Sequence, residues 1–235
     1  VGRLGAQILR STIRDGSIVG IGDGASVAAV ADALSETASP LTATIVPLAG
    51  GYWAPGPERE PFRRVAESLG AKAHGLMAPG LVDDPATKRS LEAHAGVKTV
   101  LDLWRRLDVA LFGIGGRGWS AASVGDGIER LLDRAGAVGE VLIAPFDVDG
   151  RFVCAELRER AIAFDARALG RVPVAIGVGS GPGKIKPILG ALRAGIVRTL
   201  VTDVATAEAV VALEAHTLAS TGGLSPVTAS GEPRR

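Results

Sequence analysis

The fold is decided by Ser17-Ile-Val-Gly-Ile-Gly-Asp-Gly-Ala-Ser26, which joins a short apolar run to a glycine-rich turn. The apolar run is typical of a buried strand. The residues from Ser26 to Leu34 that follow the turn are rich in Ala and Val and have helical periodicity. A strand that leads through such a turn into a helix is the building block of a parallel sheet covered by helices.

The same alternation continues on both sides of this stretch. On the N-terminal side, Leu4, Ile8, Leu9 and Ile13 recur at helical spacing, and Asp15-Gly16 ends that helix. On the C-terminal side we expect strands at 42–48, 73–77, 108–112, 140–144, 172–178 and 199–202, with helices at 58–69, 126–134, 185–193 and 205–216 and a helical stretch that reaches Arg106. Strands that alternate with helices and are apolar on both faces predict the α/β class, with a mostly parallel, Rossmann-like sheet flanked by helices.

The composition fits one domain of this class. The chain has 235 residues, of which 47% are hydrophobic, and this is enough for a substantial core. We therefore expect a single domain over residues 1–216. From Ser220 onward the sequence is polar, rich in Gly, Pro and Ser and without periodicity, so we expect residues 217–235 to form a disordered tail.

Charge and cysteine content argue against several classes of function. Lys and Arg number 26 and Asp and Glu 25, so the net charge of +1 gives no sign of a nucleic-acid-binding surface or a basic membrane patch. The single cysteine, Cys154, has no intrachain disulfide partner, and no apolar run is long enough to cross a bilayer. The cytoplasm is the expected location. Because the chain begins with Val1 at a predicted helix and shows no signal-peptide pattern, we expect a segment upstream of it.

Function is expected in the loops that follow the strands, since ligands of open α/β sheets bind at the carboxyl ends of the strands. The loop Gly20–Ser26 brings backbone N–H groups to the start of a helix, which suits an anion. Asp23 and Ser26 are further contacts from this loop. A tight turn in which Asp23 or Ser26 caps the helix is an equal alternative.

Two further loops are rich in glycine. Gly113-Ile-Gly-Gly-Arg-Gly118 follows a strand but does not lead at once into a helix, so we interpret it as a lid or wall of the pocket. Gly177-Val-Gly-Ser-Gly-Pro-Gly-Lys184 precedes a helix, and Lys184 adds a positive charge where a bound anion would meet the helix dipole. Val178 and Ile185 do not fit a Walker A loop, which argues against ATP. The alternative is a glycine-rich lead-in to a helix, with its lysine in solvent.

The remaining candidates are acidic or aromatic. Glu140, near the start of a predicted strand, suits hydrogen bonds from sugar hydroxyls. The turn Phe146-Asp-Val-Asp-Gly150 has too few oxygen ligands for calcium, and Asp147 and Asp149 are typical of the caps of a β-turn. The histidines show no metal-ligand spacing, so no metal site is expected. Trp53 lies in a predicted loop, where an indole either stacks on a sugar face or packs.

Eight motifs follow one another in a distinctive order. They are Gly20-Ile-Gly-Asp-Gly-Ala-Ser26, Val46-Pro-Leu-Ala-Gly-Gly51, Ala78-Pro79, Gly113-Ile-Gly115, Gly136-Ala-Val-Gly-Glu140, Phe146-Asp-Val-Asp-Gly150, Gly179-Ser-Gly-Pro-Gly-Lys184 and Leu200-Val-Thr-Asp203. No single motif is specific, but together, from Leu4 to about Leu213, the chain resembles the sugar-binding domain of SorC-family transcription regulators. The resemblance implies a fold similar to the ribose-phosphate and glucosamine-phosphate isomerases, used to sense a phosphorylated sugar or sugar alcohol.

The resemblance also implies partners and a site. Family members carry an N-terminal helix-turn-helix, which this chain lacks, and commonly form tetramers, so we expect a homo-oligomer that reaches operator DNA only through that missing segment. The ligand phosphate would lie at Gly24–Ser26 and near Lys184, with Glu140 on the sugar hydroxyls. The candidate ligand-binding residues are Gly22, Asp23, Gly24, Ala25, Ser26, Gly50, Gly51, Trp53, Gly115, Glu140, Asp147, Gly181 and Lys184.

Two rival functions remain open. An isomerase of the same fold needs a general base near the substrate carbon and a ring-opening acid, for which Asp23, Glu140 and Asp147 are candidates without an evident second group. A nucleotide-dependent oxidoreductase is indicated by Gly20-x-Gly-x-x-Ala25, but the next strand ends in Pro47-Leu-Ala-Gly50, without the acid that holds a ribose. We therefore expect a sensor that is not an enzyme and needs no cofactor.

Overall fold

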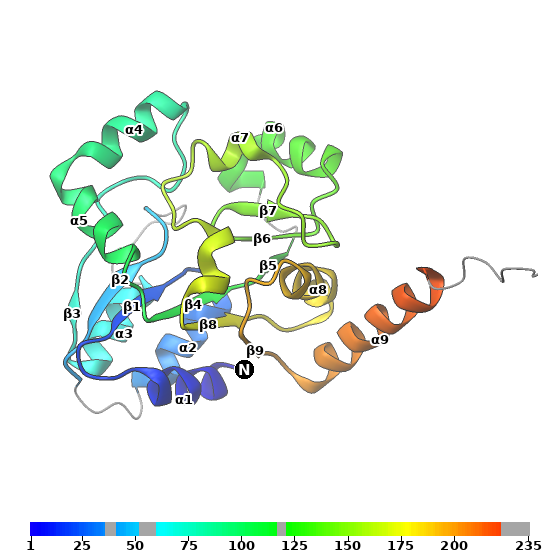
Figure 1. Ribbon diagram of the computed structural model, residues 1–235, viewed down its shortest axis with the longest axis horizontal. Helices are drawn as coiled ribbons and strands as arrows, with labels where there is room; N and C mark the ends of the chain where they lie inside the picture. The colour runs from blue at the N-terminus through cyan, green and yellow to red at the C-terminus, as the bar shows by residue number, and fades with distance from the viewer. Residues whose placement is uncertain (36–40, 52–59, 117–120, 222–235) are drawn as a thin grey trace, which may run out of the picture.

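A parallel sheet forms the centre of the molecule. The computed structural model describes residues 1–35, 41–51, 60–116 and 121–221. Within them, six parallel strands lie in the order β3-β2-β1-β4-β8-β9 (Figure 1). The strands are β1 (Ile18–Ile21), β2 (Thr44–Pro47), β3 (Lys72–Ala73), β4 (Val109–Gly113), β8 (Val174–Val178) and β9 (Thr199–Val201). This sheet confirms the predicted α/β class.

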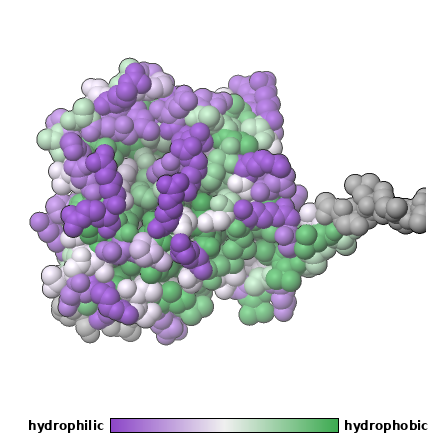
Figure 2. All heavy atoms as spheres, viewed as in Figure 1, coloured by the Kyte–Doolittle hydropathy of each residue, from purple (hydrophilic) through white to green (hydrophobic). Residues whose placement is uncertain are grey.

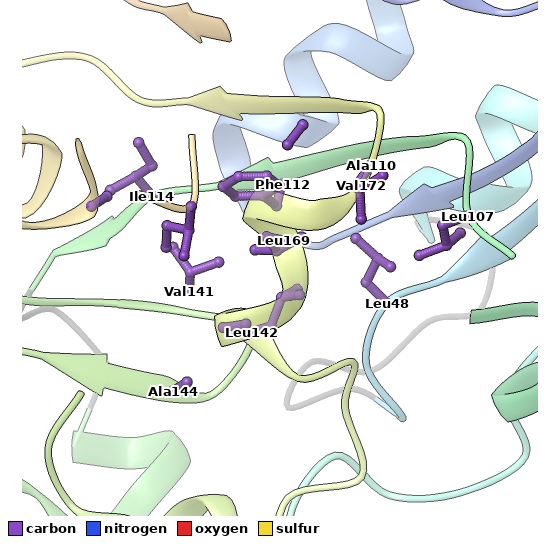
Figure 3. Close-up of a cluster of buried hydrophobic side chains, with 14 of the residues drawn as sticks. Leu48, Leu107, Ala110, Phe112, Ile114, Val141, Leu142, Ala144, Leu169 and Val172 are labelled. Atoms are coloured by element: carbon purple, nitrogen blue, oxygen red, sulfur yellow. The ribbon is translucent and has the colours of Figure 1, made fainter. Parts of the chain in front are cut away.

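Helices cover both faces of the sheet, and each strand contributes alternate residues to the two faces. In β4, Val109 and Leu111 belong to the apolar cluster under α1 (Gly2–Thr12), α2 (Ala25–Ser35) and α3 (Pro61–Leu69). Ala110 and Phe112 belong to the cluster on the opposite face (Figure 3). That second face is covered by α5 (Ala95–Trp104), the 3-10 helix η2 (Ala166–Arg171) and α8 (Ile185–Arg193). Burial on both faces explains why the central strands β1 and β4 are continuous apolar runs.

A second, small sheet corrects the strand predicted at 140–144. Here β6 (Gly139–Val141) and β7 (Ala144–Phe146) form an antiparallel hairpin, and β6 also pairs with β5 (Gly115–Gly116). The chain reverses at Leu142 and Ile143, whose φ angles are 52° and 64°. Tight hairpin turns with positive φ usually use Asn or Gly, so an uninterrupted apolar run gave no sign of this reversal.

Other boundaries also differ from the prediction. The helical stretch before Arg106 is two helices, α4 (Pro85–Ala93) and α5, because the extended backbone of His94 interrupts it. The third strand is two residues long, and α6 (Ala121–Arg134) begins before residue 126. The last helix, α9 (Val204–Thr221), continues past residue 216, so residues 217–221 are helical. The rest of the predicted tail lies outside the described residues.

Two short helices complete the description, α7 (Ala155–Arg158) and the 3-10 helix η3 (Pro182–Lys184). No helix among the described residues is long and apolar enough to cross a membrane.

Candidate functional site

The candidate site lies where the strand order of the parallel sheet changes direction. From β1 the chain continues to β2 and β3 on one side, whereas β4, β8 and β9 lie on the other side (Figure 1). Ligands of open α/β sheets bind at this position, beyond the carboxyl ends of the strands. The loops after β1, β4 and β8 meet there, because these three strands are neighbours and parallel.

Close contacts join these three loops. A Cβ atom added to Gly113, at the end of β4, would lie 3.0 Å from the carbonyl oxygen of Asp23 in the first loop. A Cβ atom added to Gly116 would lie 3.2 Å from the carbonyl oxygen of Gly183 and 3.6 Å from Nζ of Lys184. The loop after β4 therefore forms the floor between the first loop and the lysine.

The first loop holds its backbone close to β4 and then leads into α2. The N–H of Gly22 donates to the carbonyl oxygen of Leu111 at 2.7 Å, and a Cβ at Gly22 would lie 3.2 Å from Cα of Phe112. Gly24 has a φ of +104° with no atom within 4 Å of an added Cβ, so the backbone angle and not space requires glycine there. The first N–H groups of α2, from Ala25 onward, have no partner within the helix and point to this edge.

Asp23 brings a carboxyl group to the same loop. Asp23 is exposed to solvent on one side. The neighbouring protein atoms partly desolvate its carboxyl group and so raise its pKa, and the negative charge of Glu60 raises this pKa further. A backbone hydrogen bond from Gly24 and the charge of Arg64 act in the opposite direction. A raised pKa makes this carboxyl easier to protonate, which lessens its repulsion of a bound anion.

Glu140 is held at the site by the small sheet. It pairs with Gly115 in the antiparallel register of β5 and β6, and its Oε2 accepts a hydrogen bond from the N–H of Ile143 at 3.2 Å. A Cβ atom at Gly115 would overlap Oε1 of Glu140, so glycine is required where the two strands meet. The reversal at Leu142 and Ile143 thus positions the carboxylate that the sequence singled out.

Lys184 is the cation of the site. It lies half-buried at the start of α8, and this burial lowers its pKa, whereas the negative charge of Glu140 raises it. Gly181, in the same loop, has a φ of +100°, and its N–H donates to Oγ1 of Thr206 at 2.8 Å and Oδ2 of Asp203 at 3.3 Å. The edge of the sheet therefore combines the carboxyl groups of Asp23 and Glu140, the amine of Lys184 and two helix starts around a glycine floor.

Gly50 and Gly51 have a packing reason of their own. A Cβ at Gly50 would lie 2.6 Å from the carbonyl oxygen of Ala78, and one at Gly51 would lie 3.0 Å from the same atom. These glycines let the chain after β2 run directly against residues 78–80. Trp53 lies outside the described residues.

Asp147 is engaged in a turn and not in this cluster. Its Oδ1 accepts hydrogen bonds from the N–H groups of Asp149 at 3.0 Å and Arg151 at 2.9 Å. This geometry matches the turn-capping interpretation of Asp147, so we do not include it in the proposed site.

Sequence reasoning did not single out three residues that shape the site. Gly139 is one, because an added Cβ would lie 2.7 Å from the carbonyl oxygen of Gly115. Asp203 and Thr206 are the others, since they fix the loop that carries Lys184. The available signal was an Asp and a Thr three residues apart at the start of a helix, which is a capping pattern. Among the described residues, no group of His, Cys, Asp and Glu has the arrangement of a metal site.

Comparison with known proteins identifies the family. Residues 1–212 match the model of the Sugar-bind family, which describes a sugar-binding domain. The sorbitol operon regulator of Klebsiella pneumoniae is 28% identical over 221 residues, covering 88% of this chain and 69% of that protein. The erythritol catabolism regulatory protein EryD of Brucella abortus is 28% identical over 222 residues, covering 90% of this chain and 69% of the relative.

Solved structures agree with this assignment. The probable sor operon regulator of Shigella flexneri superimposes with a TM-score of 0.83 at 28% identity, covering 89% of this chain and 86% of that one. The full-length sorbitol operon regulator SorC of Klebsiella pneumoniae gives a TM-score of 0.82 at 26% identity, covering 88% and 70%. With a family match over most of its length, this chain belongs to the Sugar-bind family, the sugar-binding domains of SorC-type transcription regulators.

Proposed function

We propose that this chain is the effector-sensing domain of a transcription regulator and that its effector is a phosphorylated sugar or sugar alcohol. The observation that carries the proposal is the half-buried Lys184 at the start of α8, beside the glycine floor of β5 and across from Glu140. Relatives named as a sorbitol operon regulator and an erythritol catabolism regulatory protein support a ligand that is a sugar or sugar alcohol.

Each half of such a ligand has a matching group. A phosphate dianion is attracted by the partial positive charge at the starts of α2 and α8 and by the full charge of Lys184. A carboxylate such as Glu140 accepts hydrogen bonds from sugar hydroxyls. Because Glu140 is held by the amide of Ile143, its orientation is set before the ligand arrives, which reduces the entropic cost of binding.

We further propose that the domain senses its ligand without transforming it. The two relatives that are similar to this chain in sequence are named as regulators. In the complete regulator, operator DNA would be contacted by a DNA-binding segment outside this chain, and two or more copies would assemble to read a symmetric operator in the cytoplasm.

The test is a ligand screen with two readouts. Thermal unfolding is followed with sugar phosphates and with the same sugars lacking the phosphate, and each mixture is then analysed for new products. We expect a rise in Tm with at least one phosphorylated ligand and a smaller rise with its unphosphorylated form. We expect no new product in any mixture. Conversion of the ligand would instead identify an isomerase, and equal shifts for both forms would contradict a phosphate site.

A further inference from the structure

A second pocket lies beside the hairpin of β6 and β7, on the face that points away from Glu140. Glu140 pairs with Pro145, whereas Val141 pairs with Ala144, and successive residues of a strand point to opposite faces of a sheet. Ala144 lines the second pocket, which has a volume of about 320 Å³. None of the described residues that line it belongs to the candidate sugar site, so the two sites are separate.

The walls of this pocket come from α4, the chain after α7 and the start of η2, which is the yellow helix in the centre of Figure 1. Lys88 of α4 donates a hydrogen bond from Nζ to the carbonyl oxygen of Arg158 at 3.3 Å and forms an ion pair with Glu92 at 3.7 Å. At the start of η2, Oδ1 of Asp165 accepts the N–H of Arg167 at 3.1 Å. These contacts fix the walls before any ligand is present.

Most of the pocket lining is apolar. In Figure 2 hydrophilic residues gather over η2, in the middle of the face, and apolar surface lies beside them. The apolar lining residues are Leu142, Ala144, Ala161, Ala163, Phe164 and Ala166. Because alanine side chains are short, they leave room for a flat body beside the ring of Phe164. An apolar lining with few polar groups, at a volume above roughly 300 Å³, is typical of a small-molecule site.

Arg158 is the cation of the pocket that has no partner of its own. Its side chain is half-buried, and its guanidinium forms no hydrogen bond or ion pair with the part of the chain that the structure describes. Asp165 and Arg167 pair with each other at 2.7 Å. The pKa of Asp165 is lowered mainly by its hydrogen bond with Arg167 and least by the charge of Arg158. Glu159, the other acid of the lining, is exposed, so solvent screens its charge.

We propose that this pocket binds a small aromatic carboxylate, with Arg158 as the partner of the carboxylate group. A guanidinium offers two parallel N–H donors that match the two oxygens of a carboxylate. A single positive charge suits a monoanion better than a phosphate dianion, which Asp165 and Glu159 would repel more strongly. A planar ring fits between the alanines and Phe164. The proposal is independent of the proposed function, because it uses none of the residues of the sugar site.

Saturation-transfer NMR with benzoate tests the proposal, since this method detects weak ligands of large proteins. We expect benzoate to bind with a Kd of about 1 mM or tighter. Benzamide has the same shape without the charge, and acetate has the charge without the ring, so each should bind at least about tenfold more weakly. No binding of benzoate at about 10 mM, or equal affinities for benzoate and benzamide, would overturn the proposal.

Substitutions locate the benzoate. Arg158→Met keeps the length of the side chain and should weaken benzoate binding at least about tenfold. Arg158→Lys keeps the charge without the paired donors and should give an intermediate affinity, which also covers the case in which the first variant does not fold. Arg89→Ala is the matched control, because Arg89 is exposed and lies outside the pocket lining. Parent affinity in either folded Arg158 variant overturns the proposal, as does a loss in Lys184→Ala, which would place benzoate in the sugar site.

Discussion

Replacement of Lys184 by alanine tests the phosphate site most directly. The lysine lies at the start of α8, half-buried and within the field of Glu140, so it is a single charge at a defined place. Loss of one charge-assisted hydrogen bond to a phosphate costs about 1.5 to 3 kcal/mol, which is about tenfold or more in affinity. The fold should change little, because the lysine side chain makes no capping hydrogen bond at the start of α8 and belongs to neither apolar cluster.

The assay is calorimetric titration with a phosphorylated sugar that binds the parent protein. Lys186→Ala is the matched control, because Lys186 has the same charge, lies two residues further along in the first turn of α8 and is exposed. We expect Lys184→Ala to lose at least about tenfold in affinity and Lys186→Ala to lose less than about twofold. Equal losses would mean that long-range charge and not a contact is responsible.

The pH dependence of binding follows from the same lysine. Burial lowers the pKa of Lys184 in the free protein, and a bound phosphate dianion raises it, so ligand binding favours the protonated amine. Affinity should therefore be full at low pH within the range where the phosphate is dianionic, and fall as pH rises through the pKa of the free lysine. In Lys184→Ala this decline should disappear. Unchanged affinity in a folded Lys184→Ala variant would falsify the phosphate site altogether.

Three further predictions concern the surroundings of the site and the stability of the domain. Gly115→Ala should displace Glu140, because Oε1 of Glu140 occupies the space of the new Cβ. The variant should bind the sugar about tenfold more weakly and lose about 1 to 3 kcal/mol of unfolding free energy. Unchanged calorimetric affinity would show that this carboxylate does not touch the ligand. Hydrogen bonds from Thr206 lower the pKa of Asp203. The ionised Asp203 therefore stabilises the folded protein above pH 3.8, the ordinary pKa of an aspartate, and this contribution is lost as the pH falls through the lowered pKa. Asp203→Asn should flatten that acid-side decline in urea unfolding, and an unaltered profile would assign the decline to other groups. Burial raises the pKa of Cys154, so at pH 8 its alkylation should be at least about tenfold slower in the native protein than in urea, and equal rates would contradict the buried position.

Much of the fold was predictable from local pattern. β1 consists of Ile, Val and Gly, and every residue of β4 before Gly113 is apolar, which identifies strands that are buried on both faces. The hairpin of β6 and β7 was not predictable, because its turn uses Leu142 and Ile143 at positive φ. Tertiary contacts impose that conformation, and no propensity rule assigns it to a leucine and an isoleucine.

The meeting of the loops at one edge of the sheet was predictable, but the contacts within the candidate site were not. Parallel strands bring Gly24 and Lys184 to one edge, a conclusion that needs only the order of elements. The contact between Glu140 and Gly115 depends on the small antiparallel sheet, which the sequence did not indicate. The sequence could not decide the role of Asp147, because an acidic residue near a glycine is as typical of a β-turn as of a ligand site. In the structure, Asp147 accepts hydrogen bonds within a turn.

The loop that carries Lys184 is also bonded to the start of α9, and this links the candidate site physically to the last helix. Thr206 and Asp203 accept the N–H of Gly181, and Thr206 is buried. A ligand that moves this loop must either carry the first turn of α9 with it or break these hydrogen bonds. In the first case the orientation of α9 changes relative to the body, and in the second the helix keeps its position and the N–H of Gly181 loses its two acceptors. The free energy available for reorienting the helix is the difference in ligand affinity between its two orientations, so a tightly bound ligand with no such preference leaves α9 in place.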